Sequence, residues 1–527
     1  MTAPLRFVNR FVEQLPGDPS LENRSRPVTG ALWSKVSPTA VAAPKLIAYS
    51  KELAQQLGLD ESTMRDQATV NVLAGNGLWE GMAPFAANYG GHQFGHWAGQ
   101  LGDGRAIVLG EAVTRNGDRL ELQLKGAGPT PYSRRGDGRA VLRSSIREFL
   151  CSEAMYQLGV PTTRALSLVT TGDLVMRDMF YDGNAENEPG AIVCRVAPSF
   201  LRFGNFELCT SRNDIALLKT LTDFTIQNYF AHLGAPSKET YGAFFKEVAQ
   251  RTAQLMAHWQ AVGFVHGVMN TDNMSILGLT IDYGPYGWVD NFDPSWTPNT
   301  TDAQHRRYRF GNQPAIGLWN VERLGIALLP LIDDEEAVEA GLVAFQETFE
   351  LESARRLSEK LGLSLTGDPE DFKLINDCFA WLAAEETDMT VFFRALSQVA
   401  ILEAAPDVMP AAILNALYAP DTASAAHLTT GLRWLQRWWL RARKTQAVTG
   451  SHLAARLNSV NPKFVLRNWL AQEAIDSAHA GNTDAVSLLL DVMRHPFEEQ
   501  PGREHFAQKR PDWARSKPGC SALSCSS

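Results

Sequence analysis

The chain carries the stretch His266-Gly267-Val268-Met269-Asn270-Thr271-Asp272-Asn273-Met274-Ser275-Ile276-Leu277, followed after one glycine by Leu279-Thr280-Ile281-Asp282-Tyr283-Gly284. Asn273 and Asp282 bracket a short hydrophobic hairpin in this stretch. Amide and carboxylate oxygens are ligands that Mg²⁺ takes in proteins, and water and phosphate complete its shell. The stretch therefore predicts a magnesium and phosphate site at the end of an apolar strand, Leu279–Ile281.

A second charged pair lies upstream of this stretch. Apolar and polar residues alternate within Leu120–Lys125, which predicts a half-buried strand that ends at Lys125. A helix is predicted over about Val141–Leu158, with Glu148 in its middle. Protein kinases hold a strand lysine on the nucleotide phosphates through an ion pair with a helix glutamate. Together with the two candidate metal ligands, this pair predicts a protein-kinase-like fold.

The pattern of the chain changes along its length as such a fold requires. Over 81–198, glycine-rich turns separate short alternating runs, which predicts a strand-rich N-lobe. Over 199–400 the apolar spacing is helical, which predicts a helical C-lobe that contains the catalytic loop. We expect 1–80 to form an N-terminal extension with a helix at Ala43–Leu57, and 401–527 to form a C-terminal helical region and a flexible tail. The predicted class is therefore α+β, a kinase-like fold with helical extensions at both ends. Its predicted N-lobe strands include Arg105–Leu109, Leu120–Lys125, Ser167–Thr171 and Ile192–Val196.

The composition excludes several classes of protein. Hydrophobic residues make up 45% and charged residues 20% of the chain, which is ordinary globular usage. The net charge of -9 provides no general positive field, so we expect neither nucleic acid nor a membrane as partner. No apolar run reaches the roughly 20 residues of a bilayer span, and no apolar leader opens the chain, so we expect a cytoplasmic protein. Six scattered cysteines without zinc-type spacing suit a reducing compartment.

Two glycine-rich segments stand between the expected N-terminal extension and the helix that carries Glu148. Gly126–Arg139 combines small residues with three arginines, and its backbone N–H and guanidinium groups can hold phosphate oxygens. His92 and His96 lie four residues apart, but their glycine neighbours disfavour the helix that would align them as metal ligands. We therefore expect a phosphate-binding loop at the first segment and a packing or turn role for the two histidines.

One position departs from the kinase pattern. A phosphotransferase loop of this type keeps its catalytic aspartate two residues after the histidine, where this chain has Val268. A valine can neither accept a proton nor bind a metal. Asp272 is the only carboxylate in the loop, and it would approach a substrate from a different angle. The sequence therefore weakens the interpretation of the chain as a simple kinase.

Four motifs resemble the selenoprotein O (SelO) family: Tyr89-Gly90-Gly91-His92-Gln93-Phe94-Gly95-His96, Gly102-Asp103-Gly104-Arg105, Leu124-Lys125-Gly126-Ala127-Gly128 and His266–Asn273. The resemblance runs from near the N-terminus to the tail. It implies a pseudokinase fold that binds ATP in a flipped orientation and transfers AMP to Ser, Thr or Tyr hydroxyls of target proteins, releasing pyrophosphate. It also implies Mg²⁺ or Mn²⁺ as the metal, UMP transfer from UTP with manganese as a further reaction, and redox-related targets.

Carried over by position, the resemblance makes Asp272 the proton acceptor and Asn273 and Asp282 the metal ligands. Glu148 becomes the partner of the phosphate lysine. The implied ATP contacts are Gly102, Gly104, Arg105, Lys125, Asp137, Gly138, Arg195, Arg202 and Asp282. A flipped triphosphate directs its β- and γ-phosphates away from the metal side, so the arginine cluster would neutralise the pyrophosphate leaving group.

The end of the chain also fits the resemblance. Some family members carry selenocysteine third from the C-terminus, and Cys525 holds that place here. A redox role for Cys525, together with Cys520, is therefore a hypothesis. The polar segment Pro496–Ser527 is predicted to fray.

Three functions remain open at this point. The first is protein AMP or UMP transfer that uses Asp272, Asn273 and Asp282. The second is a conventional kinase, which the valine in the catalytic loop disfavours. The third is a catalytically silent pseudokinase scaffold, which has no physical need for two metal ligands and a phosphate lysine.

Overall fold

The computed structural model describes residues 4–179, 183–364, 368–444 and 449–524. Its centre is a ten-stranded sheet in the order β2-β3-β5-β8-β9-β12-β11-β4, with β1 added beside β8 and β10 beside β12. The strands pair antiparallel apart from β2 and β3. The strands of this sheet are β1 (Arg6–Val8), β2 (Gly17–Asp18), β3 (Trp33–Lys35), β4 (Lys45–Tyr49), β5 (Phe85–Ala87), β8 (Ala106–Val113), β9 (Arg119–Lys125), β10 (Ala140–Val141), β11 (Arg164–Arg177) and β12 (Glu186–Ala197). Two short hairpins lie outside it, β6 (His92–Gln93) with β7 (His96–Trp97), and β13 (Phe264–Val265) with β14 (Gly287–Trp288).

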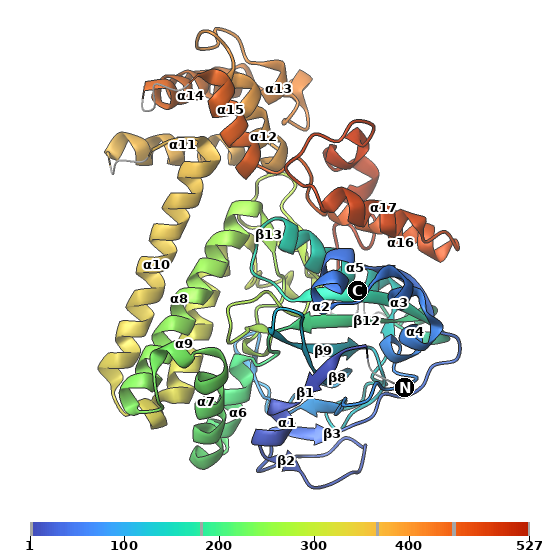
Figure 1. Ribbon diagram of the computed structural model, residues 1–527. Coiled ribbons are helices and arrows are strands. Elements are labelled where there is room, and N and C mark those ends of the chain that lie inside the picture. Colours follow the sequence, from blue (N-terminus) through green and yellow to red (C-terminus); the bar gives the residue numbers. More distant parts are fainter. Residues whose placement is uncertain (1–3, 180–182, 365–367, 445–448, 525–527) are drawn as a thin grey trace.

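The helices fall into three groups along the chain (Figure 1). Those of the N-terminal half are α1 (Arg10–Gln14), α2 (Lys51–Leu57), α3 (Glu61–Arg65), α4 (Gln67–Leu73) and α5 (Leu142–Gln157). Those of the C-lobe are α6 (Phe203–Ser211), α7 (Ile215–Tyr229), α8 (Lys238–Val262), α9 (Gln313–Ile332) and α10 (Glu335–Leu361). Those of the C-terminal region are α11 (Pro369–Ala384), α12 (Met389–Ala400), α13 (Ala411–Leu414), α14 (Ala425–Lys444), α15 (Gly450–Val460), α16 (Asn468–His479) and α17 (Asp484–Met493).

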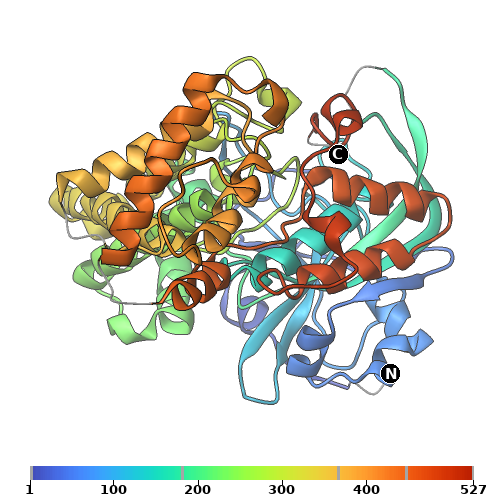
Figure 2. The same ribbon diagram turned by 90° about the horizontal axis from the view of Figure 1, so that it is seen from above.

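Alternation of side chains along the sheet gives it two different faces. Leu122 and Leu124 of β9 point into a core that α2, α3 and α4 cover. On the opposite face Val193 of β12 packs with Ile146 and Phe149 of α5 and joins the large core of the C-lobe helices. Figure 2 shows α16 and α17 lying beside α5. The strand-rich N-lobe and helical C-lobe of the predicted α+β fold are therefore confirmed.

The predicted strands and the helix that carries Glu148 are present with nearly the expected bounds. The single helix predicted over Ala43–Leu57 is wrong, because its first part is the edge strand β4 and only its second part is α2. Pairing with β11 satisfies the backbone of β4, and this tertiary contact overrides a weak helical pattern. The N-terminal extension thus contributes short helices and also four strands of the sheet. The division of the chain at residues 80, 198 and 400 stays a prediction.

The C-terminal segment does not fray as predicted, at least over its described residues 496–524. The side chain of Leu523 has no exposed surface, and its backbone accepts from Thr300 N at 2.7 Å and donates to Pro298 O at 3.0 Å. The segment therefore packs beside the residues that follow the catalytic loop. Backbone pairing and one buried leucine supply the contacts that its polar composition did not indicate.

One helical segment has the length and composition of a membrane span, which the sequence prediction overlooked. It covers Phe310–Ile332 and consists of a short 3-10 turn and α9. In the fold 56% of its most apolar window is buried, and α9 packs against α8 and α10. A core helix passes the same test of length and composition, so this segment supports no membrane assignment.

Candidate active site

A cavity of about 950 Å³ lies between the sheet and the helical lobe. Eight Lys and Arg side chains and four carboxylates line it, although the chain as a whole is acidic. Each residue that the sequence assigned to catalysis, nucleotide or metal is among the lining residues: Gly102, Gly104, Arg105, Lys125, Asp137, Gly138, Arg195, Arg202, Asp272, Asn273 and Asp282. The structure therefore brings together residues that lie as much as 180 positions apart. The excess of positive charge suits a polyanionic ligand.

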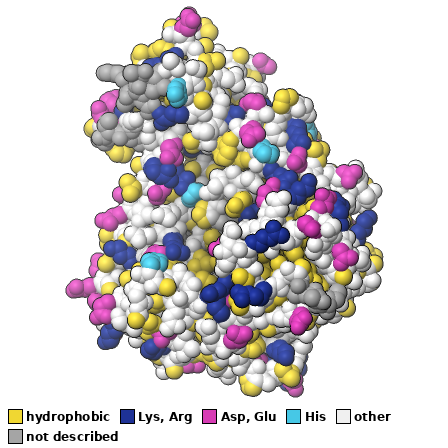
Figure 3. Space-filling view, in the orientation of Figure 1, with side chains coloured by type: hydrophobic (Ala, Val, Ile, Leu, Met, Phe, Trp, Pro, Cys, Tyr) yellow, Lys and Arg dark blue, Asp and Glu magenta, His cyan; other side chains and the backbone are white. Residues whose placement is uncertain are grey.

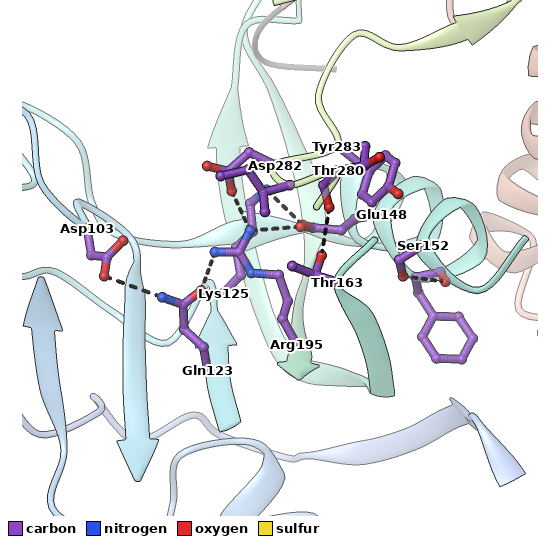
Figure 4. Close-up of polar contacts among 12 residues, drawn as sticks. Asp103, Gln123, Lys125, Glu148, Ser152, Thr163, Arg195, Thr280, Asp282 and Tyr283 are labelled. Carbon is purple, nitrogen blue, oxygen red and sulfur yellow. Dashed lines mark hydrogen bonds and ion pairs between the residues drawn. The ribbon is translucent and has the colours of Figure 1, made fainter. Parts of the chain in front are cut away.

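The predicted lysine–glutamate pair forms at the inner wall of this cavity. Lys125 Nζ lies 2.7 Å from Glu148 Oε2, and Arg195 Nη1 donates to Glu148 Oε1 at 3.0 Å (Figure 4). Arg195 stands opposite Gln123 in the register of β9 and β12, so both point to the face that α5 covers. Burial lowers the pKa of Lys125 and Glu148 opposes that shift, while Arg105 and Arg195 lower it further.

Asp282 forms ion pairs with two of the predicted arginines, Arg195 and Arg202. Arg195 donates to its Oδ1 and Arg202 to its Oδ2. Burial alone would raise the pKa of Asp282, but Arg202, Arg195 and Lys125 together hold it well below its usual range. Asp282 also has a positive φ of 55°, a region that Asp and Asn tolerate better than other side chains. It is therefore a fixed anion at neutral pH.

The residues before Asp282 do not form the predicted apolar strand. Thr280 makes only isolated bridges, with backbone hydrogen bonds to Pro161 O at 2.9 Å and from Thr163 N at 3.0 Å, and side-chain hydrogen bonds also hold the segment. Trp259 Nε1 donates to Thr280 Oγ1 at 2.9 Å, and His266 Nε2 donates to the carbonyl of Ile281 at 2.9 Å. The C-lobe core thus positions Asp282 through its neighbours, which a pattern of three apolar residues does not reveal.

Arg202 enters the site from the start of α6. Its backbone N–H donates to Asn205 Oδ1 at 2.8 Å, which fixes the first turn of the helix. Its Nη1 also donates to the backbone carbonyl of Asp272 at 2.8 Å, and its guanidinium lies over the ring of Tyr89 at 4.6 Å. Arg202 therefore joins the carboxylate that begins the Asp-Tyr-Gly turn to the catalytic loop.

Asp272 lies in a short 3-10 turn, Thr271–Asn273, and is 8% exposed. Gln93 Nε2 donates to its Oδ2 at 3.2 Å. Its Oδ1 is buried without a hydrogen-bond partner, and a Cβ at Gly91 would lie 2.7 Å from that atom. Burial raises the pKa of Asp272 to about 7, against the lowering effects of Gln93 and Arg202. This carboxyl group can therefore take up a proton near neutral pH, and Oδ2 is the oxygen that is not sealed by Gly91.

Asn273 and Asp282 offer oxygen atoms of the kind that bind Mg²⁺ or Mn²⁺. Asn273 Nδ2 donates to the carbonyl of Val268 at 2.9 Å, which leaves the amide oxygen for a cation. Asp282 supplies a carboxylate in the same cavity. No group of three or more His, Cys, Asp and Glu side chains suited to a metal occurs in 4–179, 183–364, 368–444 and 449–524. Mg²⁺ bound by two protein oxygens together with phosphate and water needs no such group.

Glycines let the backbone pack closely in the two loops that the sequence predicts to contact nucleotide. A Cβ at Gly102, which has a φ of 78°, would lie 2.4 Å from the ring of Tyr132. A Cβ at Gly138, with a φ of 70°, would lie 2.1 Å from the backbone of Gly128. Glycine is required at both positions, since any side chain would collide and adopt a strained conformation.

Several lining residues were not predicted from the sequence. Gln93 is the hydrogen-bond partner of Asp272, and Arg177 of β11 forms a two-point ion pair with Asp137 at 2.7 and 2.8 Å. This pair lowers the pKa of Asp137. The carboxylate of Asp137 is therefore already paired with Arg177 before any ligand binds. Of these residues, only Gln93 could have been found from the sequence, because it lies inside one of the four quoted motifs.

The hairpin β6–β7 joins the sheet to the catalytic loop. His92 N donates to Thr271 Oγ1 at 2.7 Å, and Phe94 N donates to Asn270 Oδ1 at 3.2 Å. The contact of Gln93 with Asp272 lies between these two bonds. The predicted turn role of the histidines is therefore confirmed, and the hairpin has a further part in the site.

The five cysteines in the described part of the chain do not line the cavity. Cys151, Cys194, Cys209, Cys378 and Cys520 are buried and not disulfide-bonded. Burial raises the pKa of Cys520 to about 12, which keeps it as an unreactive thiol. Cys525, for which a redox role was predicted, lies outside the described residues.

Comparison with known proteins agrees with the motifs. A family model described as protein adenylyltransferase SelO matches residues 19–494. The protein nucleotidyltransferase YdiU of Aromatoleum aromaticum is 58% identical over 523 residues, which are 98% of this chain and 99% of that protein. The protein of the same name from an Azoarcus species is 57% identical over 525 residues, 99% of this chain and 100% of that one. A solved structure, ROP2 from Toxoplasma gondii, described as having a protein-kinase fold and no enzymatic activity, is 11% identical over 56% of this chain and 87% of its own, with a TM-score of 0.24 that adds no support. By its motifs, its cavity and its match over nearly the whole length, this chain belongs to the SelO protein adenylyltransferase family.

Proposed function

We propose that this chain transfers a nucleoside monophosphate to protein hydroxyls, and that the reaction is AMP transfer from ATP to Ser, Thr or Tyr. The observation that carries the proposal is Asp272, a carboxyl group with a pKa raised to about 7 at the wall of a basic cavity. The same loop has Val268 where a kinase keeps its base. Family membership supports this class of reaction.

The chemistry assigns a role to each end of the cavity. Asp272 Oδ2 accepts the proton of the target hydroxyl while the hydroxyl oxygen forms a bond to the α-phosphorus. The bond between the α-phosphorus and its bridging oxygen breaks, and pyrophosphate leaves. Asn273 and Asp282 would hold Mg²⁺ or Mn²⁺, which when bound neutralises phosphate charge and polarises the reacting phosphate.

The leaving group needs positive charge on the side away from Asp272. Arg105, Arg134 and Arg135 line the cavity, and within the described part of the chain none of them has a carboxylate within 4 Å. Lys125 and Arg195 complete this basic wall. A flipped ATP would direct its β- and γ-phosphates toward these side chains, which stabilise the negative charge that builds on pyrophosphate.

The test uses ATP labelled at the α-phosphate or at the γ-phosphate, with wild-type protein, Asp272→Asn and Asp282→Asn. Transfer of α-label alone to a mixture of cellular proteins, lost in both variants, is the expected result. Transfer of γ-label would identify a kinase. Tight ATP binding without any transfer would identify a scaffold. An arm with α-labelled UTP and Mn²⁺ decides between AMP and UMP, because faster labelling there would make UMP transfer the main reaction.

A further inference from the structure

A cluster of arginines without carboxylate partners lies beside the catalytic loop. The segment His305-Arg306-Arg307-Tyr308-Arg309 follows the Asp-Tyr-Gly turn by about 20 residues and precedes α9. Ion pairs are common along the described chain, yet none within 4 Å involves Arg306, Arg307 or Arg309. The nearest acidic group, Asp302, accepts from the backbone N–H of Arg307 and of Tyr308 at 2.9 and 2.7 Å. Asp302 also attracts Arg307 and His305 through space, but it forms no ion pair within 4 Å with either side chain.

Arg307 is held in a fixed orientation by aromatic rings. Its guanidinium lies over the ring of Trp319 at 4.7 Å, and a Cβ at Gly95 would lie 3.4 Å from its Cζ. Its Nε and Nη2 are buried and make no hydrogen bond. Leaving donors of a charged group unsatisfied is costly, so a carboxylate that reaches Arg307 as the side chains around it shift would gain hydrogen bonds from these donors.

Hydrogen bonds connect this cluster to the proton acceptor. Tyr308 OH donates to Asn270 Oδ1 at 2.7 Å and accepts from Phe94 N at 2.9 Å. Phe94, Asn270 and Asp272 all line the main cavity. Gly95, against which Arg307 packs, is the next residue after Phe94. The arginine cluster is therefore continuous with the wall on which the target hydroxyl reacts.

Aromatic side chains extend the same surface. His92 lies 5.1 Å from the ring of Trp97 and 5.6 Å from the ring of Trp319. Trp97 is 38% exposed, which is unusual for so large an apolar side chain. Figure 3 shows Lys and Arg side chains in several clusters on the face turned to the viewer, with acidic side chains scattered over the same face. Arginine and tryptophan together are the residues that protein-binding surfaces favour.

We infer that the segment 305–309, with Trp97 and Trp319, docks the target protein and recognises an aspartate or glutamate next to the target hydroxyl. This inference rests on the proposed function and names the class of its protein substrate. Arg307 is the specificity-determining residue. The guanidinium binds the carboxylate of the target and the exposed Trp97 packs against the target backbone, while Trp319 holds Arg307 in place.

The test measures AMP transfer to a peptide with one serine flanked by glutamates, and to matched peptides with glutamine or lysine in their place. Arg307→Glu should raise the KM for the acidic peptide at least about tenfold and leave the KM for ATP unchanged. The same variant should prefer the lysine peptide, since the charges are then exchanged. Arg433→Glu, at an exposed position of α14, is the control and should behave as wild type.

A second measurement keeps this inference separate from the proposed function. Fluorescence anisotropy follows binding of the acidic peptide with its serine replaced by alanine, so no transfer is needed. Binding that Arg307→Glu weakens supports the docking site even where no nucleotide is transferred. Equal binding of the acidic, glutamine and lysine peptides to wild type would overturn it. Competition by single-stranded RNA together with indifference to peptide charge would also overturn it and would identify a nucleic-acid site.

Discussion

Gln93 donates a hydrogen bond from Nε2 to Asp272 Oδ2 at 3.2 Å, across 179 positions of sequence. The other carboxylate oxygen, Oδ1, is buried next to Gly91 and has no hydrogen-bond partner. Gln93 therefore determines the orientation of Oδ2. Replacement of Gln93 by methionine keeps the length of the side chain and removes the donor. We expect kcat for transfer to fall about tenfold, because a misplaced base loses much of its effect.

The control for Gln93→Met is the KM for ATP, which should not change. Transfer to a tyrosine peptide should also suffer less than transfer to a serine peptide, because a phenol loses its proton more easily. A variant that loses ATP binding and both transfers in parallel would mean that Gln93 only stabilises the fold.

The raised pKa of Asp272 predicts a pH profile. The carboxyl group must be ionised to accept a proton, so kcat should rise about tenfold per unit below pH 7 and level off above it. Asp272→Asn should remove the transfer. A flat profile between pH 5.5 and 8 under conditions where chemistry is rate-limiting would exclude Asp272 as the base.

The same pKa predicts an effect on stability with a defined sign. Because the pKa of Asp272 is raised in the folded state to about 7, the group favours folding at low pH, and this contribution is lost as the pH rises through 7. Asp272→Asn never ionises. The unfolded carboxyl group, with an ordinary pKa of 3.8, is already ionised at pH 5, so without nucleotide the amount by which the free energy of unfolding of the variant exceeds that of wild type should grow by on the order of 2 kcal/mol between pH 5 and pH 8. Urea unfolding at both pH values measures the difference.

Asp282 neutralises two buried arginines, so its removal should cost stability as well as activity. Asp282→Asn leaves Arg195 with Glu148 at 3.0 Å and Arg202 with Asp103 at 3.9 Å as their remaining carboxylates, and should lower the free energy of unfolding by about 3 kcal/mol. Asp282→Ala should cost about 1 kcal/mol more, because alanine tolerates the positive φ less well than asparagine. Equal stability of the two variants would contradict this account of the backbone.

Two glycines of one loop offer a matched pair for nucleotide binding. A Cβ at Gly138 would collide with the backbone of Gly128, whereas a Cβ at Gly136 would only touch Ser133 O at 3.2 Å. Gly138→Ala should therefore weaken ATP binding at least about tenfold, and Gly136→Ala should change it little. Isothermal titration with ATP measures both. A similar loss in the two variants would show that the loop responds to any change in flexibility.

Much of the site could be predicted because its parts are local. Strand alternation places Lys125, and helix spacing places Glu148, so their pairing needs only the register of one sheet with one helix. Asn273 and Asp282 lie close in sequence on either side of a tight turn. Local patterns of this kind predict structure without knowledge of the tertiary contacts made by the rest of the chain.

The remainder depends on contacts that no local pattern encodes. The apolar spacing of the β4 residues indicates a helix, but in the fold these residues pair with β11 as a strand. The polar segment 496–524 packs because Leu523 finds a place beside Pro298 and Thr300. The part of Gln93 in orienting Asp272 arises only once β6–β7 meets the C-lobe, since glycine-rich sequence indicates a turn and not its contact.

The hairpin β6–β7 lies outside the large sheet, follows β5 and precedes β8 in the chain, and is hydrogen-bonded through His92, Gln93 and Phe94 to Asn270, Thr271 and Asp272. Two-lobed enzymes commonly admit and release their ligands by hinging the lobes apart. In this chain such a hinge would first have to break three hydrogen bonds at the centre of the site. Separation of the lobes is therefore coupled to the turn that carries Asp272, because the same three hydrogen bonds hold that turn in place.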